Sequence, residues 1–245
     1  MRKNRILRFI LQHYMWYHND YKFMIKVLGH RGCAGIEPEN TIRAFKRAMD
    51  LGVDFIELDV RKSRDKKLVV IHDDRVDRTT NGNGSVRDLT FEVIRKLDAG
   101  KGEKIPSLEE ALDLLKKEKQ RIAIEIKEPD TLDEIVKIVT KEGLSSKVII
   151  VSFWHNVLKR IKEIEPEIKT GAIFVGRPVD AVSIAKAAKS ELICLKHKFV
   201  DEEVVVECHT NDIGVNAWVV NEIEDIERMK ELGVDIISSD YPDRV

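Results

Sequence analysis

Charged, imidazole and indole side chains stand where short apolar segments of this sequence end. A spacing of two residues in an extended strand puts both side chains of a pair on one face. Glu57 and Asp59 have this spacing, and so do Glu125 and Lys127. In chain order, the residues at segment ends that could carry chemistry are His30, Arg31, Glu57, Asp59, His72, Glu125, Lys127 and Trp218, and Asp240 lies beyond the last segment without an assigned role.

The three acids Glu57, Asp59 and Glu125 form an oxygen-rich ligand set if their strands are neighbours. Hard ligands of this kind suit one divalent cation, Mg²⁺ or Ca²⁺, with water and a substrate phosphate completing the shell. Three unpaired acids in one place repel one another, and a bound cation removes that cost. A purely structural ion network with Arg31 and Lys127 is the alternative on charge count alone.

The remaining residues suit the chemistry of a phosphate ester. His30 and His72 can exchange protons near neutral pH, which an acid and base pair requires. Arg31 and Lys127 are the donors expected around a phosphate group. Trp218 has two interpretations, an aromatic wall for a substrate or the completion of the core.

A scaffold must bring these segment ends together, and the sequence predicts one with eight strands. Strands are expected over residues 26–30, 54–60, 121–127, 147–152, 169–174, 191–195, 213–219 and 234–238, with helical patterns between them, for example over 40–51, 107–119, 132–142, 156–165 and 222–232. The alternation predicts an α/β protein with a (β/α)₈ TIM barrel, in which functional residues cluster at the C-terminal ends of the strands. An open doubly wound sheet is the alternative, and the sequence lacks its Gly-rich fingerprint.

One segment interrupts the alternation. Residues 68–71 follow the second strand too soon for a parallel crossover, so they are expected to return as an antiparallel hairpin. A tight turn near Asp65 and Lys66 would then place His72 roughly opposite Asp59. We expect a barrel domain over residues 25–245 with a small hairpin-and-loop insertion at about 61–106.

Residues 1–24 are expected to form an amphipathic extension, because apolar residues recur there at helical spacing. For residues 1–23 we favour packing on protein over contact with a membrane surface. No apolar run in the chain is long enough to span a bilayer. The sequence carries no signal for oligomeric state.

The amino-acid composition limits which cellular compartment and which classes of binding partner are expected. The formal net charge is −1, which removes the electrostatic argument for nucleic acid as a partner. Charged residues make up 35% of the chain and glutamine is scarce, which resembles the surface of a thermophile protein. Cys33, Cys194 and Cys208 fit no disulfide or metal spacing, so a reducing, cytoplasmic setting is expected.

Taken together, the motifs resemble the glycerophosphodiester phosphodiesterase family from about Met24 to the C-terminus. In chain order they read HRG, PENT, ELDV, VVIHDD, EIK, SF, AWVVN and SDYP. The resemblance implies a barrel enzyme that uses a divalent cation to hydrolyse a small glycerophosphodiester to sn-glycerol 3-phosphate and an alcohol. It implies an acid and base pair in His30 and His72, metal ligands in Glu57, Asp59 and Glu125, phosphate contacts in Arg31 and Lys127, and an aromatic pocket wall in Trp218.

Two other functions remain open at this stage. One is a lysophospholipase D-like or phospholipase C-like activity on lipid substrates, which the N-terminal extension would favour. The other is a non-catalytic phosphodiester-binding protein, against which the retention of both histidines and all three acids argues. No serine or cysteine in the sequence resembles a nucleophile activated by an adjacent base, so a covalent enzyme intermediate is not expected. Similarity to barrels that cleave inositol lipids favours the substrate's own hydroxyl over water as the nucleophile.

Overall fold

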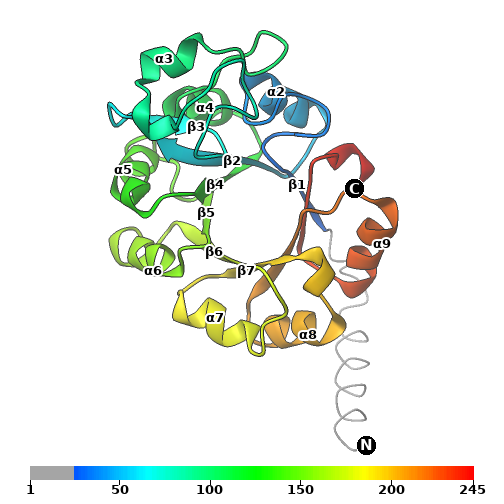
Figure 1. The fold of residues 1–245 in the computed structure, drawn as a ribbon. Coiled ribbons are helices and arrows are strands. Elements are labelled where there is room, and N and C mark those ends of the chain that lie inside the picture. The colour runs from blue at the N-terminus through cyan, green and yellow to red at the C-terminus, as the bar shows by residue number, and fades with distance from the viewer. Residues whose placement is uncertain (1–24) are drawn as a thin grey trace, which may run out of the picture.

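The computed structural model describes residues 25–245, so the predicted extension over residues 1–24 lies outside the described residues. Eight parallel strands form a closed barrel, seen along its axis in Figure 1. They are β1 (Lys26–Gly29), β2 (Phe55–Lys62), β4 (Arg121–Ile126), β5 (Val148–Ser152), β6 (Lys169–Phe174), β7 (Leu192–Lys196), β8 (Gly214–Trp218) and β9 (Ile236–Ser239). Strand β1 pairs with both β2 and β9, which closes the sheet and confirms the predicted barrel.

Helices surround the barrel, one after most strands (Figure 1). They are α2 (Ile42–Asp50), α4 (Leu108–Leu115), α5 (Leu132–Lys141), α6 (His155–Ile164), α7 (Ala181–Ala187), α8 (Glu202–Thr210) and α9 (Ile223–Leu232), with 3₁₀ turns η2 (Pro129–Thr131), η3 (His197–Phe199) and η4 (Pro242–Arg244). Local sequence sets their ends: Ser107 and Glu110 form a capping box before α4, and Gly233 ends α9 at φ 72°. No helix within residues 25–245 is long and apolar enough to cross a membrane.

Alternation along the strands divides the apolar residues into layers. In β2, Ile56, Leu58 and Val60 pack in the cluster that includes the helix residues Phe45 and Leu112. Phe55, from the other face of β2, packs in the barrel interior with residues such as Leu28 and Ala123. Glu57 and Asp59 lie on the same face as Phe55, because side chains two apart share a face. The strand period therefore places both acids inside the barrel.

The segment after β2 forms the hairpin that the sequence predicts. Strand β3 (Leu68–Val70) pairs antiparallel with β2, with Val60 opposite Val70, and Lys66 at φ 65° makes the turn. The amide of Ile71 donates to the carbonyl of Asp59 at 3.0 Å, so His72 lies one residue beyond the position expected for it. The turn η1 (Val86–Asp88) and helix α3 (Phe91–Lys96) follow and share a small apolar core with Val69 and Ile71.

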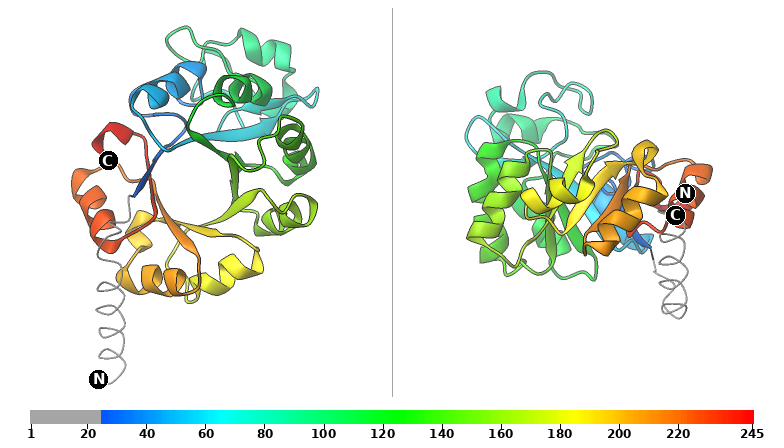
Figure 2. Two further views of the ribbon diagram at one scale, coloured as in Figure 1. Left: turned by 180° about the vertical axis from the view of Figure 1, so that it is seen from behind. Right: turned by 90° about the horizontal axis from the view of Figure 1, so that it is seen from below.

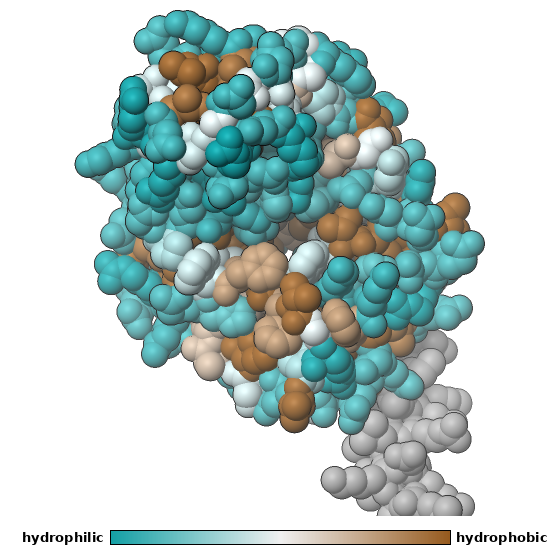
Figure 3. All heavy atoms as spheres, viewed as in Figure 1, coloured by the Kyte–Doolittle hydropathy of each residue, from teal (hydrophilic) through white to brown (hydrophobic). Residues whose placement is uncertain are grey.

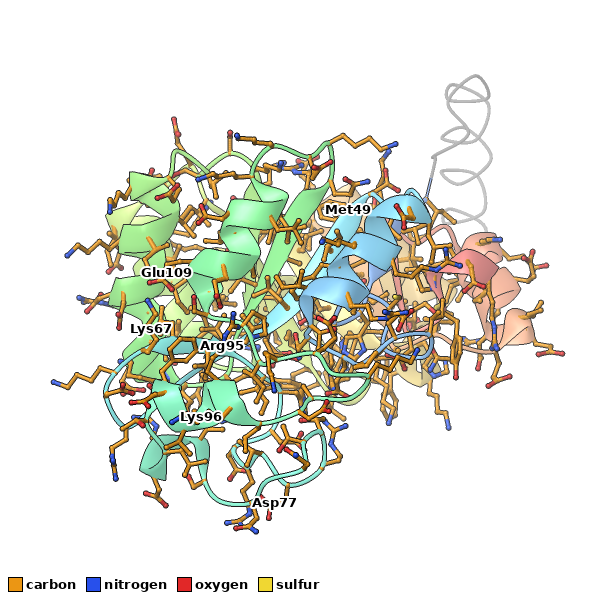
Figure 4. All side chains as sticks on the ribbon, turned by 90° about the horizontal axis from the view of Figure 1, so that it is seen from above. Met49, Lys67, Asp77, Arg95, Lys96 and Glu109 are labelled. Carbon is orange, nitrogen blue, oxygen red and sulfur yellow. The ribbon has the colours of Figure 1, made fainter. Side chains whose placement is uncertain are left out.

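The segment from β3 to α3 projects beyond one end of the barrel (Figure 2, right). Viewed from above in Figure 4, the labelled Asp77 and Lys96 lie on this projection, whereas Met49 on α2 lies towards the other end of the barrel. The hairpin is held to α4 by an ion pair between Lys67 Nζ and Glu109 Oε1 at 2.6 Å, and both residues are labelled there. The projection overhangs the end of the barrel at which β2 finishes.

Candidate active site

The first part of the site is the tight loop after β1. Leu28 packs in the barrel interior, so His30, two residues later, points to the same side. Gly32 has φ +85°, and a Cβ on it would lie 2.7 Å from the backbone carbon of Ala44 in α2. Only glycine allows this approach, which lets the loop fold back against the helix. The same turn holds Arg31 at φ 51°, where its amide donates to Glu57 Oε2 at 2.7 Å.

The second part is the acidic cluster from two adjacent strands. Glu57 and Asp59 come from β2, and Asp59 is in register with Glu125 on the parallel neighbour β4. One carboxylate oxygen from each of these three acids lies within 4.8 Å of the others. All three side chains are buried, Asp59 completely. The structure therefore brings together the three residues that the sequence predicts as metal ligands.

Two cations and an amide hold Asp59. Arg31 Nε lies 3.3 Å from its Oδ2, and Lys127 Nζ lies 3.6 Å from its Oδ1. Asn40 Nδ2 donates to Asp59 Oδ2 at 2.8 Å, while the Asp59 amide donates back to Asn40 Oδ1 at 3.2 Å. Lys127 also donates to Glu125 Oε1 at 2.7 Å. The predicted phosphate contacts thus lie directly beside the acids.

The chemistry of this donor set fits a divalent cation. Burial raises the pKa of Glu57 well above its ordinary value, and the charges of Asp59 and Glu125 raise it further. Burial also raises the pKa of Glu125 to about 7, with the charge of Asp59 adding to the effect. Glu57 Oε1 and Asp59 Oδ1 are buried and have no hydrogen-bond partner. Unpaired buried carboxylate oxygens are costly, and coordination of a hard cation satisfies them.

Each predicted catalytic histidine has a carboxylate at the same ring nitrogen. His30 Nδ1 lies 2.7 Å from Asp240 Oδ1, and His72 Nδ1 lies 2.6 Å from Asp73 Oδ1. A partner at Nδ1 fixes the ring orientation and leaves Nε2 available for proton transfer. Burial lowers the pKa of His72. The charge of Lys127 lowers this pKa further, whereas the charge of Asp59 opposes the shift.

One cavity joins these groups at the mouth of the barrel. Its polar lining includes His30, Arg31, Glu57, His72, Glu125 and Lys127, while Asp59 lies fully buried below. Trp218 lines the opposite wall and makes an edge-to-face contact with Phe153, the ring centroids being 5.9 Å apart. The indole Nε1 of Trp218 is buried without a hydrogen-bond partner. All eight residues singled out in the sequence therefore converge on one place.

Four further residues at the site were not assigned roles from the sequence. Asp240 and Asp73 contact the two histidines, Asn40 bridges to Asp59, and Glu39 accepts from Arg31 NH1 at 2.8 Å. A signal for them exists, because they lie in the motifs SDYP, VVIHDD and PENT. Asp240 was noted from the sequence only by its place beyond the last strand, since nothing in the sequence says which side chain each acid faces.

A closed parallel barrel with an acidic, histidine-flanked cavity at its C-terminal mouth defines a class, the α/β-barrel enzymes that can act on phosphate esters. Within that class, residues 30–244 match the model of the glycerophosphoryl diester phosphodiesterase family. The chain belongs to this family, as the motifs indicate.

Known relatives agree in sequence and in fold. The glycerophosphodiester phosphodiesterase of Caldanaerobacter subterraneus subsp. tengcongensis is 40% identical over 229 residues, which cover 89% of this chain and 94% of the relative. The Oleispira antarctica phosphodiesterase, solved with the product sn-glycerol-3-phosphate, superposes with a TM-score of 0.85 at 27% identity, covering 91% of this chain and 96% of that one. The glycerophosphodiester phosphodiesterase of Thermotoga maritima superposes with a TM-score of 0.76 at 26% identity, covering 89% of this chain and 96% of that one.

Proposed function

We propose that this protein hydrolyses small glycerophosphodiesters to sn-glycerol 3-phosphate and an alcohol. The observation that carries the proposal is the single cavity that holds both histidines, the acidic cluster and two phosphate-type donors. Membership of the family and the relatives that bear this activity as their name support the same reaction. A substrate phosphate is recognised in proteins by cationic donors of this kind.

We assign the roles of the residues as follows. His30 and His72 transfer protons through Nε2, one accepting a proton from the attacking oxygen and the other donating one to the leaving alcohol. Arg31 and Lys127 bind the phosphate oxygens, and Trp218 forms one wall of the pocket. Each of these side chains lines the cavity.

Glu57, Asp59 and Glu125 would hold the cation, which we propose to be Mg²⁺ or Ca²⁺ because the ligands are all carboxylate oxygens. When bound, the cation supplies positive charge that polarises the phosphate and stabilises the charge developing on it. The fold itself holds the carboxylates close together, and their mutual repulsion is offset only by cations.

A product assay tests the proposal. We expect release of glycerol 3-phosphate from a panel of glycerophosphodiesters that differ in the alcohol, supported by Mg²⁺ or Ca²⁺ and abolished by a chelator. The panel also identifies the preferred alcohol and metal. Binding of the substrates without any turnover would support a non-catalytic binding protein and overturn the proposed reaction.

A second candidate function, action on single-chain phospholipids, is favoured by one feature of the surface. Five exposed apolar residues follow β5, β6 and β7 at the mouth of the barrel, and we call them the apolar rim: Phe153, Trp154, Val175, Val179 and Phe199. In Figure 3, apolar residues gather on the surface below the opening, whereas the surface above the opening is mostly hydrophilic. Phe153 belongs both to the rim and to the cavity, so an acyl chain attached to a bound phosphodiester could lie along the rim.

Trp154 lies at the N-cap position of α6. It is 49% exposed, and its side chain makes no cap hydrogen bond. Its Nε1 donates to the carbonyl of Lys127 at 3.2 Å, which orients the ring beside the cavity.

Short-chain lysophospholipids distinguish the two candidates without micelles. If the rim binds an acyl chain, an octanoyl lysophosphatidylcholine should be cleaved at least ~10-fold more efficiently than glycerophosphocholine, since each buried methylene contributes up to about 0.8 kcal/mol. Val179→Lys should remove that gain, whereas Ile164→Lys, at the far end of α6, should not. Equal efficiency for both substrates would leave the water-soluble diesters as the function. Vesicle co-sedimentation with and without residues 1–23 tests whether that segment contributes.

The remaining assignments are also proposals. We propose that the enzyme works in the cytoplasm, which is consistent with three free, buried cysteines, Cys33, Cys194 and Cys208. We retain residues 1–24 as an amphipathic extension and residues 25–245 as the phosphodiesterase domain, with the insertion at about 61–106. Nucleic acid is not expected as a partner at a net charge of −1.

A further inference from the structure

Arg78, on the projecting segment after β3, bridges two carboxylates at the mouth of the barrel. Its NH1 and NH2 donate to Glu39 Oε2 and Oε1, both at 2.7 Å. Its Nε and NH2 donate to Asp73 Oδ2 and Oδ1 at 2.6 and 3.0 Å. One planar guanidinium therefore forms a two-bond fork with each of two acids, the geometry in which arginine recognises carboxylates best.

Each of these acids also contacts a group that lines the catalytic cavity. Asp73 Oδ1 lies 2.6 Å from His72 Nδ1, and Glu39 Oε1 accepts from Arg31 NH1 at 2.8 Å. A continuous set of contacts therefore runs from Arg31 through Glu39, Arg78 and Asp73 to His72. We propose that Arg78 is a positioning residue that fixes the imidazole of His72 and the guanidinium of Arg31 relative to each other.

The geometry separates Arg78 from an ordinary surface ion pair, which contributes little. The Glu39 and Asp73 side chains are only 15% and 25% exposed, although Arg78 itself is 49% exposed. Hydrogen bonds from Arg78 are the largest influence holding the pKa of Asp73 well below its usual range. Burial alone would raise the pKa of Glu39. The hydrogen bonds and charges of Arg78 and Arg31 outweigh the effect of burial, so the pKa of Glu39 lies below its ordinary value.

The arrangement also explains why the residue is arginine. Without a cation between them, Glu39 and Asp73 would repel each other and could turn away from the groups that they orient. A lysine at position 78 would keep the charge but could not form two forks at once. We therefore expect a lysine to replace the electrostatic part of the role and not the geometric part.

The inference rests on the proposed function and is tested with the full chain. Arg78→Ala should lower kcat on the order of 10²-fold, because a small misplacement of a catalytic group has effects of this size. Arg78→Lys should lower kcat by a smaller factor, since lysine keeps the charge and loses only the paired hydrogen bonds. Thermal unfolding should show that both variants are folded. Methylguanidinium in the assay should restore part of the activity of Arg78→Ala, since the site is open to solvent, whereas tetramethylammonium at the same concentration should not.

Arg75 provides a matched control in the same segment. Its NH2 lies 2.9 Å from Asp77 Oδ1, and both side chains are exposed. Asp77 lies at the outer tip of the projection in Figure 4, away from the barrel. Arg75→Ala should therefore leave kcat, KM and the methylguanidinium response as in the unmodified protein, because its ion pair has no contact that leads to the site.

A second readout does not depend on turnover. Nitrogen-15 spectra of the imidazole should show a change in the Nδ1 environment of His72 in Arg78→Ala and no change in Arg75→Ala. A folded Arg78→Ala with kcat within 2-fold of the unmodified protein and an unchanged His72 signal would overturn the inference. Absence of turnover in the unmodified protein would count against the proposed function alone, because the spectra would still report on the positioning of His72.

Discussion

The Nδ1 atom of His30 lies 2.7 Å from Oδ1 of Asp240, a residue 210 positions later in the chain. The barrel brings them together because β1 pairs in parallel with β9, where Leu28 is opposite Ser238, two residues before each partner. Asn221 Nδ2 donates to Asp240 Oδ2 at 2.8 Å, and the Asp240 amide donates to Asn221 Oδ1 at 3.0 Å. The orientation of His30 is therefore set at the seam where the barrel closes.

Replacing Asp240 with asparagine should impair catalysis more than binding. The amide removes the negative charge that fixes the Nδ1 proton of His30, so the ring loses its preferred tautomer and orientation. We expect kcat to fall on the order of 10²–10⁴-fold, the range in which proton transfer contributes, with a smaller change in KM. Steady-state kinetics measure this. Asp243→Asn, at an exposed position three residues later, is the control, and a kcat in Asp240→Asn equal to that control would contradict the role.

Loss of either histidine should be as damaging as loss of both. If His30 and His72 act on the two sides of one reaction, His30→Ala and His72→Ala should each lower kcat by about 10²–10⁴-fold. The double variant should be little worse than either single one, because groups that act as a unit are not additive. His155→Ala serves as the control, since His155 instead contacts the carbonyl of Ile173 at 2.8 Å. Turnover near the control value in one single variant would make that histidine structural.

Metal binding should depend on Glu125. Glu125→Gln keeps the shape of the side chain but removes one charge from a cluster whose ligand atoms lie within 4.8 Å of one another. Calorimetry should show much weaker binding of Mg²⁺ or Ca²⁺ in this variant, while circular dichroism shows an intact fold. Glu163→Gln, an exposed position on α6, should bind as the unmodified protein does. Equal affinity in both variants would remove Glu125 from the ligand set.

The fold and the central residues of the site follow from local pattern. Glu57 and Asp59 could be assigned to the barrel interior because a strand has a period of two, and Glu125 because the next parallel strand shows the same alternation. The hairpin after β2 followed from the short connection, which no parallel crossover can use. These inferences need only neighbouring residues or the general geometry of a parallel barrel.

The partners of the site residues could not be predicted in the same way. Asp240 and His30 are 210 positions apart, and their contact depends on how the barrel closes. The bridge through Arg78 depends on how a loop without regular structure folds over the mouth, which the sequence pattern leaves undefined. The short connection predicted His72 roughly opposite Asp59, and His72 lies one residue beyond that point. The remaining offset could not be predicted, because hairpin register depends on the turn, whose Lys66 takes a left-handed conformation.

The thiols of the protein should be unreactive until high pH. Burial raises the pKa of Cys33 and of Cys208 to about 11, and that of Cys194 to about 12. A raised thiol pKa means that the reactive thiolate forms only as pH approaches that value, so at pH 8 about one thiol in 1,000 is ionised at Cys33. Ellman's reagent should detect no thiol in the native protein at pH 8 and three in denaturant. A rapidly reacting native thiol would contradict the burial of that cysteine.

The last prediction concerns the nucleophile that attacks phosphorus. The structure shows which side chains of the cavity could serve as this nucleophile. Cys194 and Ser238 line the cavity, but both contact Asn216 rather than a base: Asn216 Nδ2 lies 3.6 Å from Cys194 Sγ, and Ser238 Oγ donates to Asn216 Oδ1 at 2.9 Å. Neither is activated for attack, so a covalent enzyme intermediate is not expected. Water and the glycerol hydroxyl next to the phosphate remain.

We expect the hydroxyl to attack, because it is already held beside phosphorus and gains from proximity. Its oxygen would bond to phosphorus as the bond to the alcohol breaks, with one histidine taking the hydroxyl proton and the other protonating the alcohol; water would then open the cyclic phosphate. A substrate lacking that hydroxyl should be cleaved very poorly even with a good leaving group. Phosphorus NMR of a single turnover should show a transient cyclic glycerol phosphate. Comparable cleavage of the deoxy substrate with no cyclic species would instead identify water as the nucleophile.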